Sequence, residues 1–232
     1  ESTISGNTAT RGGGINNYDT LTITSSIISG NSAANNKGGG IYSTVTLTIT
    51  SSIISGNSAA DDGGGICNRC GTLTITESTI SGNTSDRHGG GICNDHHGTL
   101  TITSSTISDN TAADYGGGID SVSGTLTITS SDISDNTATY GGGIYDRTSD
   151  SGILTITGSD ISGNNVSQQG GGIYLEGTGT ITIGGSNDTD KNTICGNYKD
   201  GYSPSLDQQI GDSSGSLYET YKDTNYIFAS CE

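Results

Sequence analysis

The sequence is short of the residues that usually build a protein core. Only 28% of its 232 residues are hydrophobic and 5% are aromatic, and methionine and tryptophan are absent. Such a composition is typical of disorder, because a chain with so few apolar groups cannot offset the entropy lost on folding. If this chain folds, its apolar residues must recur at fixed positions and line one narrow core.

Basic residues are scarce as well. Twenty-four Asp and Glu stand against eight Lys and Arg, which gives a net charge of -16. The missing basic face argues against nucleic acid as a partner. An acidic exterior is typical of a solvated surface that can also attract cations. No apolar run reaches the length of a membrane span. The chain opens inside a repeat, so we expect it to be processed or excised.

What the sequence does contain is a repeat: T-L-T-I-T, then I-S-G-N or I-S-D-N, then G-G-G-I. The Leu or Ile that opens the first phrase recurs every 26 to 28 residues, at Leu21, Leu47, Leu73, Leu100, Leu126, Leu154 and Ile181. A fixed period of this size indicates one supersecondary unit stacked on itself.

The phrases of one repeat predict three strands. T-L-T-I-T alternates with period two, which places Leu and Ile inward and Thr outward, and I-S-G-N and G-G-G-I each add a short strand. In the six complete coils only the distance from the opening Leu to the Asn is constant, at ten residues, so the other two corners are loops. We predict an all-β, right-handed parallel β-helix (a solenoid) with three strands per coil, a repeat of about 26 residues, and seven to eight coils.

Two regions follow from where the repeat stops. Residues 1–197 are β-helix repeats with a partial first coil, whereas residues 198–232 do not repeat and hold the only Phe, the only Pro and five of the eleven Tyr. This tail is expected to be an aromatic cap or a docking segment. A bare first coil opposite an aromatic end would suit head-to-tail stacking into a filament.

The combination of G-G-G-I with I-x-x-N in units of about 26 residues resembles the polymorphic outer membrane protein type of β-helix repeat. That type occurs in bacterial and archaeal surface proteins and adhesins, and the resemblance covers about residues 1–200. The G-G-A and the Phe before x-x-N of its chlamydial members are missing here. The resemblance implies an extracellular or cell-surface location and no particular partner.

One asparagine recurs at the end of every second phrase. Stacked Asn side chains can bond to one another along a corner and satisfy buried backbone groups. We expect a structural ladder at Asn31, Asn57, Asn83, Asn110, Asn136 and Asn164.

The outward positions of T-L-T-I-T predict a flat face without charge. Nineteen of its 21 positions are Thr, and such a lattice resembles the face of β-solenoid ice-binding proteins, although Thr is also simply a good exposed strand residue. The face could equally pack laterally against a second solenoid. Its central members are Thr22, Thr24, Thr48, Thr50, Thr74, Thr76, Thr101, Thr103, Thr127, Thr129, Thr155 and Thr157.

The cysteines allow several interpretations. Cys67, Cys70, Cys93 and His96 have the residue types and spacing of a structural zinc site. Stacking of Cys67 on Cys93 in neighbouring coils would instead allow a disulfide. A Cys67–Cys70 bond and free thiols are the remaining alternatives. A Cys195–Cys231 disulfide would tie the tail to the last coil and agree with an extracellular location.

Other polar motifs are weaker. Acidic residues beside the second strands and before the glycines could bind Ca²⁺ weakly, but a solvated surface is the simpler interpretation. Asn165 and Asn187 each begin a glycosylation sequon in a predicted loop.

These patterns favour a structural function. No enzymatic activity is expected, because the Thr face carries no basic residue, and no cofactor is required. We expect an extracellular structural or cell-surface solenoid that adheres or self-assembles. One alternative is ice binding through the Thr face. Another is an adhesin domain that binds surface glycans through an outward aromatic column of Tyr42, Tyr145 and Tyr174.

Overall fold

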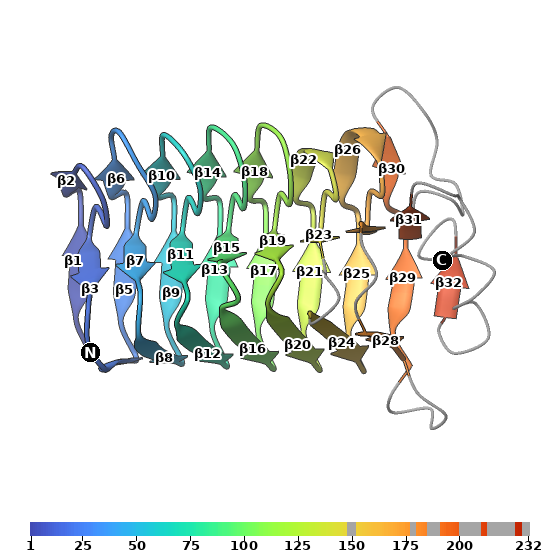
Figure 1. The fold of residues 1–232 in the computed structure, drawn as a ribbon, viewed down its shortest axis with the longest axis horizontal. Helices are drawn as coiled ribbons and strands as arrows, with labels where there is room; N and C mark the ends of the chain where they lie inside the picture. Colours follow the sequence, from blue (N-terminus) through green and yellow to red (C-terminus); the bar gives the residue numbers. More distant parts are fainter. Residues whose placement is uncertain (148–151, 177–179, 185–190, 200–209, 213–225, 229–232) are drawn as a thin grey trace.

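The computed structural model is a parallel β-helix whose coils stack side by side along one long axis (Figure 1). It describes residues 1–147, 152–176, 180–184, 191–199, 210–212 and 226–228. The predicted all-β solenoid with a period of about 26 residues is confirmed. None of the described ranges holds a helix long and apolar enough to cross a membrane.

Each complete coil has four strands rather than the predicted three. In Figure 1 the sheet that we call B runs along the top and sheet D along the bottom, with sheets A and C between them. Sheet B was missed because its strands are mostly two residues long, too short to show a period-two pattern. They lie in the corner between Asn and Gly that the sequence marked as a loop.

The strands are grouped here by sheet. Sheet A contains β1 (Thr3–Ser5), β5 (Ile27–Ser29), β9 (Ile53–Ser55), β13 (Thr79–Ser81), β17 (Thr106–Ser108), β21 (Asp132–Ser134), β25 (Asp160–Ser162), β29 (Thr193–Cys195) and β32 (Tyr226–Phe228). Sheet B contains β2 (Thr8–Ala9), β6 (Ser32–Ala33), β10 (Ser58–Ala59), β14 (Thr84–Ser85), β18 (Thr111–Ala112), β22 (Thr137–Tyr140), β26 (Asn165–Gln169) and β30 (Tyr198–Lys199). Sheet C contains β3 (Ile15–Asn17), β7 (Ile41–Ser43), β11 (Ile66–Arg69), β15 (Ile92–Asp95), β19 (Ile119–Val122), β23 (Ile144–Arg147), β27 (Ile173–Leu175) and β31 (Ile210–Asp212). Sheet D contains β4 (Leu21–Thr24), β8 (Thr46–Thr50), β12 (Thr72–Thr76), β16 (Thr99–Thr103), β20 (Thr125–Thr129), β24 (Ile153–Thr157) and β28 (Thr180–Ile183).

The core is one column of Leu and Ile that runs through the centre of the coils. Equivalent residues pair in register, so that Leu73 lies between Leu47 and Leu100, and these side chains are fully buried. Burying one such side chain stabilises the fold by about 1.5–3 kcal/mol. A chain with few apolar residues can therefore fold, because almost every Leu and Ile of the repeat enters the same core.

The Asn column forms a continuous ladder of hydrogen bonds beside this core. The Oδ1 atom of Asn136 accepts bonds from both the backbone N–H and the side-chain Nδ2 of Asn110, at 3.0 Å each. Asn110 Nδ2 also donates to the Ile80 carbonyl at 2.9 Å. The same three bonds recur from coil to coil, so each buried amide satisfies backbone groups that the corner would leave without partners.

The corner between sheets D and A is fixed by one left-handed residue in each coil. Ser51 and Ser104 have φ values of +47° and +49°, and the serine that follows each of them bonds to its counterpart in the next coil, as Ser52 N–H does to Ser78 Oγ at 3.1 Å. A single inserted residue would shift this serine ladder out of register, which accounts for the ten-residue spacing in the six complete coils. In the last coil, where the spacing is longer, Asn192 Oδ1 takes the place of the serine and accepts a hydrogen bond from Ser159 N–H at 3.0 Å.

The residue before the ladder Asn is also left-handed, which explains why the motif alternates between I-S-G-N and I-S-D-N. Gly82 has φ +61° and Asp109 has φ +56° at this position. Glycine adopts this conformation without strain, and Asp is among the few other residues that tolerate it.

The glycine triplet serves close packing more than bending. Only its first member has a positive φ, as at Gly38 (+74°). A Cβ atom on Gly39 would lie 2.3 Å from the Gly64 carbonyl oxygen of the next coil, and one on Gly40 would lie 2.7 Å from that of Gly65. Side chains at these positions would push the coils apart, so the triplet recurs in every complete coil.

The ladder leads to a stability prediction for Asn110→Ala. The substitution removes the acceptor for two Asn83 donors and the side-chain Nδ2 that donates to the Ile80 carbonyl and to Asn136 Oδ1. Since an orphaned buried polar group costs about 1–3 kcal/mol, the free energy of unfolding should fall by about 2–4 kcal/mol in chemical denaturation. The exposed Asn35→Ala is the control and should change stability by less than about 0.5 kcal/mol. Equal effects of the two substitutions would contradict a stabilising ladder.

Candidate functional site

The outer face of sheet C is the part of the β-helix where successive coils differ most in chemistry. One outward position of this sheet stays in register through seven coils, yet it carries four different residue types. We call it the variable column: Asn16, Tyr42, Cys67, Cys93, Asp120, Tyr145 and Tyr174. In the uniform Thr face of sheet D, by contrast, no coil is distinct.

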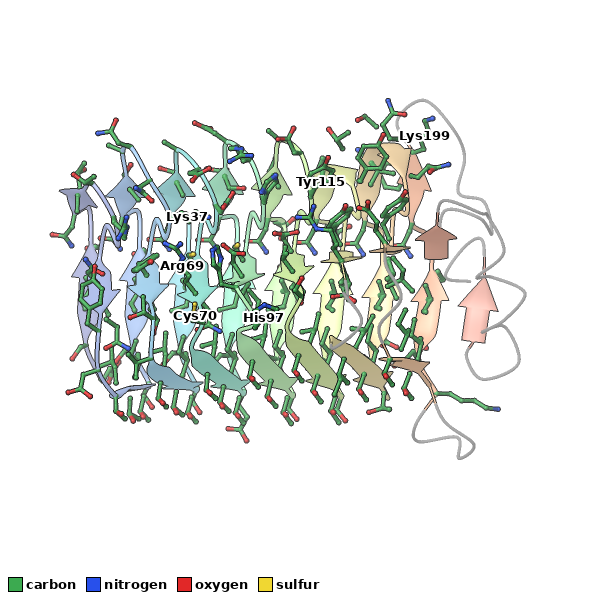
Figure 2. All side chains as sticks on the ribbon, in the orientation of Figure 1. Lys37, Arg69, Cys70, His97, Tyr115 and Lys199 are labelled. Carbon is green, nitrogen blue, oxygen red and sulfur yellow. The ribbon has the colours of Figure 1, made fainter. Side chains whose placement is uncertain are left out.

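A second column covers the variable column. It consists of the residue before each glycine triplet, and we call it the pre-glycine column: Arg11, Lys37, Asp62, His88, Tyr115, Tyr140 and Gln169. The Arg11 guanidinium lies 4.8 Å from the centre of the Tyr42 ring, and Tyr115 stacks on Tyr145 with ring centres 4.5 Å apart. Tyr42 and Tyr145 are therefore buried although they point away from the core. Figure 2 shows Lys37, Arg69 and Tyr115 in the band of side chains along the middle of the molecule.

This face also gathers the scarce basic residues. Five of the eight Lys and Arg and all three His lie on it or at its edge: Arg11, Lys37, Arg69, Arg87, Arg147, His88, His96 and His97. Lys37, Arg87 and His88 are held by carboxylates from other coils. Lys37 forms ion pairs with Asp62 and, at 3.4 Å, with Asp95, and Arg87 lies 3.0 Å from Asp61. The expectation drawn from the Thr face alone did not include this concentration of basic residues.

The centre of the charged group is a chain in which half-buried Lys37 and His88 flank the buried Asp62. His88 Nδ1 lies 3.0 Å from Asp62 Oδ1, and this hydrogen bond raises the pKa of His88 against the effect of burial. Burial alone would raise the pKa of Asp62, but hydrogen bonds from His88 and Lys37 lower it. Burial alone would lower the pKa of Lys37. The hydrogen bond and the charge of Asp62 outweigh burial, so the pKa of Lys37 is raised. All three groups are stabilised in their charged forms.

Asp120 behaves in the opposite way. It is only 2% exposed, and its Oδ1 has no hydrogen-bond partner, while Oδ2 lies 3.8 Å from Cys93 Sγ. Burial raises the pKa of Asp120 to about 7, despite the opposing attraction of His88. A carboxyl group that titrates near neutral pH is unusual and marks this coil as distinct.

The structure does not assemble the predicted zinc ligands. Cys67 and Cys93 are buried and lie opposite each other in adjacent strands. The hydrogen bond with Cys67, together with burial, raises the pKa of the Cys93 thiol, and this disfavours the thiolate that zinc needs. Cys70 is exposed, and His96 is turned to Asp95 and Arg69. Among the described residues, no three His, Cys, Asp or Glu are placed to hold a metal ion.

The disulfide alternatives differ in outcome. Cys67, Cys70 and Cys93 are free thiols, so neither a Cys67–Cys93 nor a Cys67–Cys70 bond is formed. Cys195 is buried in β29 and is not among the free thiols. Its expected partner Cys231 lies outside the described residues, so the Cys195–Cys231 disulfide stays a prediction.

Four tyrosines meet where the two columns run side by side near the C-terminal coils. Tyr115, Tyr140, Tyr145 and Tyr174 line a pocket of about 200 Å³ together with Glu176. The rings of Tyr145 and Tyr174 are parallel within 4°, with centres 5.5 Å apart. The centres of the Tyr140 and Tyr174 rings are also 5.5 Å apart. The Tyr145 hydroxyl donates a hydrogen bond to the Glu176 carboxylate. We call this the tyrosine pocket.

The predicted aromatic column is split by the structure. Tyr145 and Tyr174 contribute to the tyrosine pocket, but Tyr42 lies four coils away from Tyr145 and is 2% exposed beneath Arg11. Sequence reasoning missed Tyr115, Tyr140 and Glu176. The available signal was the position directly before G-G-G, where only two complete coils carry an aromatic residue.

The Thr face has the predicted regularity. The strands of sheet D pair without a shift from β4 to β28, so that Thr101 lies between Thr74 and Thr127. Its threonines are half-buried or exposed. No charged side chain interrupts the T-x-T positions.

The remaining polar motifs lie apart from the tyrosine pocket. Asp132 and Asp160 pair in register and line a hollow of about 380 Å³ with serines of the D–A corner. Burial raises the pKa of Asp132, and the negative charge of the neighbouring Asp160 adds to this effect. A hydrogen bond with Ser134 lowers the pKa but does not cancel the rise. Asn165 is half-buried at the start of β26 rather than in a loop, because sheet B was not foreseen. Asn187 lies outside the described residues.

The comparison with protein families agrees with this architecture. The family described as right handed beta helix region matches residues 45–188, and the chain belongs to it. Searches of curated proteins and of solved structures found no match.

Asp120 gives the face a testable pH dependence. Because its folded pKa of about 7 exceeds the value near 4 of an unfolded Asp, the folded state binds the extra proton, and this residue lowers stability as pH rises from about 4 to 7. Asp120→Asn cannot ionise. At pH 8 it should raise the free energy of unfolding by about 2–4 kcal/mol, at about 1.4 kcal/mol per pKa unit, with little effect at pH 4.

Urea denaturation at both pH values measures this difference, and the exposed Asp86→Asn serves as the matched control. A variant whose stability follows wild type at pH 8 would show that Asp120 is ionised without cost.

Proposed function

We propose that this chain is an adhesive surface module that binds glycans through the outer face of sheet C. The observation that carries the proposal is the tyrosine pocket, in which aromatic rings and a carboxylate converge on a face where the coils differ in chemistry. Sugar sites combine apolar ring surfaces with a few polar groups that fix orientation. The stacked coils supply a rigid scaffold for both.

Binding is favoured over catalysis by the number of carboxylates. The right handed beta helix family covers both enzymes and non-enzymes. Glycoside hydrolysis uses a pair of carboxyl groups across the scissile bond. In the tyrosine pocket Glu176 is the one acidic residue among the described lining groups, and the buried Asp120 does not line it.

The wider setting of this function is also a proposal. An extracellular or cell-surface location follows from the resemblance to the polymorphic outer membrane protein type of repeat. Self-association, whether lateral through the Thr face or head to tail into a filament, would add avidity to a surface module. Neither weakly bound Ca²⁺ nor a structural zinc ion is needed for glycan binding.

The test is a glycan array followed by calorimetry on the best ligand. Tyr174→Ala should weaken binding about 10- to 100-fold, since loss of one ring contact costs about 1.5–3 kcal/mol. Tyr18→Ala, which removes an exposed tyrosine from the far end of the same face, should bind like wild type. The proposal is wrong if no glycan binds, or if Tyr174→Ala binds as well as the control.

Ice binding is a second candidate, and the in-register pairing of the T-x-T strands supports it. A regular lattice of hydroxyl and methyl groups can order water at fixed spacings. Thr101→Tyr would break the lattice at its centre and should abolish thermal hysteresis. Thr111→Tyr, on the exposed side of sheet B, should leave it unchanged. Wild-type protein without thermal hysteresis would exclude this function.

A further inference from the structure

We propose that the tyrosine pocket selects an amino sugar with a free ammonium group over neutral and acidic sugars. This inference rests on the proposed glycan-binding function and names its ligand class. It starts from the charge of the pocket, because among the described lining residues only Glu176 carries one.

The hydrogen bonds of the pocket favour a donor ligand. The phenol of Tyr145 already donates to Glu176, and burial followed by this bond raises the pKa of Tyr145, so the phenol keeps its proton. The carboxylate can accept further bonds, since its two oxygens offer about four lone-pair sites. A ligand with N–H donors would form these further hydrogen bonds to Glu176, whereas a ligand carboxylate has no proton to donate.

Among the described residues, no basic side chain lines the pocket or forms an ion pair with Glu176. Arg147, on β23, acts on Tyr145 electrostatically, but it does not line the pocket. His88 stacks on Tyr115, and its charge is balanced by Asp62 and Asp114. The chain as a whole has a net charge of -16, so a uronic acid or a sulfated sugar would be repelled.

An ammonium group matches the aromatic part as well. Tyrosine rings attract cations through their negative faces, and three of the four tyrosines that line the pocket are partly exposed. The volume of about 200 Å³ is below the usual range for drug-sized ligands. This size suits one sugar ring at a time, as at the end or along the edge of an oligosaccharide.

The experiment compares three oligosaccharides of equal length by calorimetry: glucosamine, N-acetylglucosamine and galacturonic acid oligomers. The N-acetyl group removes the charge and keeps the ring. The glucosamine oligomer should bind at least tenfold more tightly than the N-acetylated one, and the galacturonic acid oligomer should not bind. Glu176→Gln should remove this preference, whereas Glu77→Gln, which changes an exposed residue at the D–A corner, should keep it.

Three other outcomes would overturn the inference. Equal binding of charged and acetylated oligomers, unaffected by Glu176→Gln, would leave the glycan-binding function standing without the ammonium preference. Binding of glucosamine oligomers that survives both Glu176→Gln and Tyr174→Ala would be general attraction to an acidic protein. Failure of every oligosaccharide to bind would remove the proposed function itself.

Discussion

The structure depends on one constraint, which is that identical positions of successive coils must lie directly above one another. Each ladder asparagine bonds to the next at about 3 Å, and the glycine triplet lets the backbones approach closely enough for those bonds to form. The in-register core follows from the same alignment. A one-residue insertion between Leu and Asn would break both ladders, whereas the longer insertion in the last coil keeps them because Asn192 and Asn197 accept the bonds from Ser159 and Asn164.

This constraint decides which parts of the molecule can vary. Inward positions are fixed by the core, and corner positions by left-handed backbone or by ladders. The outward positions of sheet C and the residue before the glycines face neither restriction, so they can carry Arg, Lys, Asp, His, Cys or Tyr without disturbing the stack. Chemistry that belongs to one coil alone can therefore accumulate on this face, and the tyrosine pocket is its most developed example.

Much of the fold could be predicted from the sequence because its signals are periodic. The alternation of T-L-T-I-T and the recurrence of Asn gave the inward and outward residues and the period of the coils. The two-residue strands of sheet B could not be predicted, since Ser32–Ala33 is too short to show a pattern. The tyrosine pocket was foreseen only through Tyr145 and Tyr174. Tyr115 and Tyr140 belong to a different column, and nothing in the sequence shows that the two columns stack on each other.

The zinc site stays a prediction, and the described residues do not bring its four ligands together. Spacing placed Cys70 and His96 at equivalent positions of two coils, but both have left-handed backbone, with φ +64° and +55°, and their side chains do not meet the buried thiols. Periodic spacing predicts register between coils. It does not predict the direction of a side chain at a corner.

The interchangeable coils have a consequence for the reach of this protein. Each added coil lengthens the stack by the spacing of adjacent strands, about 4.8 Å, and leaves the tyrosine pocket intact because its residues come from consecutive coils near one end. Duplication of a coil between Tyr42 and Asp120 would move the pocket away from the N-terminal coil by that distance. If the proposed glycan-binding function holds, the number of coils sets how far the tyrosine pocket lies from the N-terminal coil.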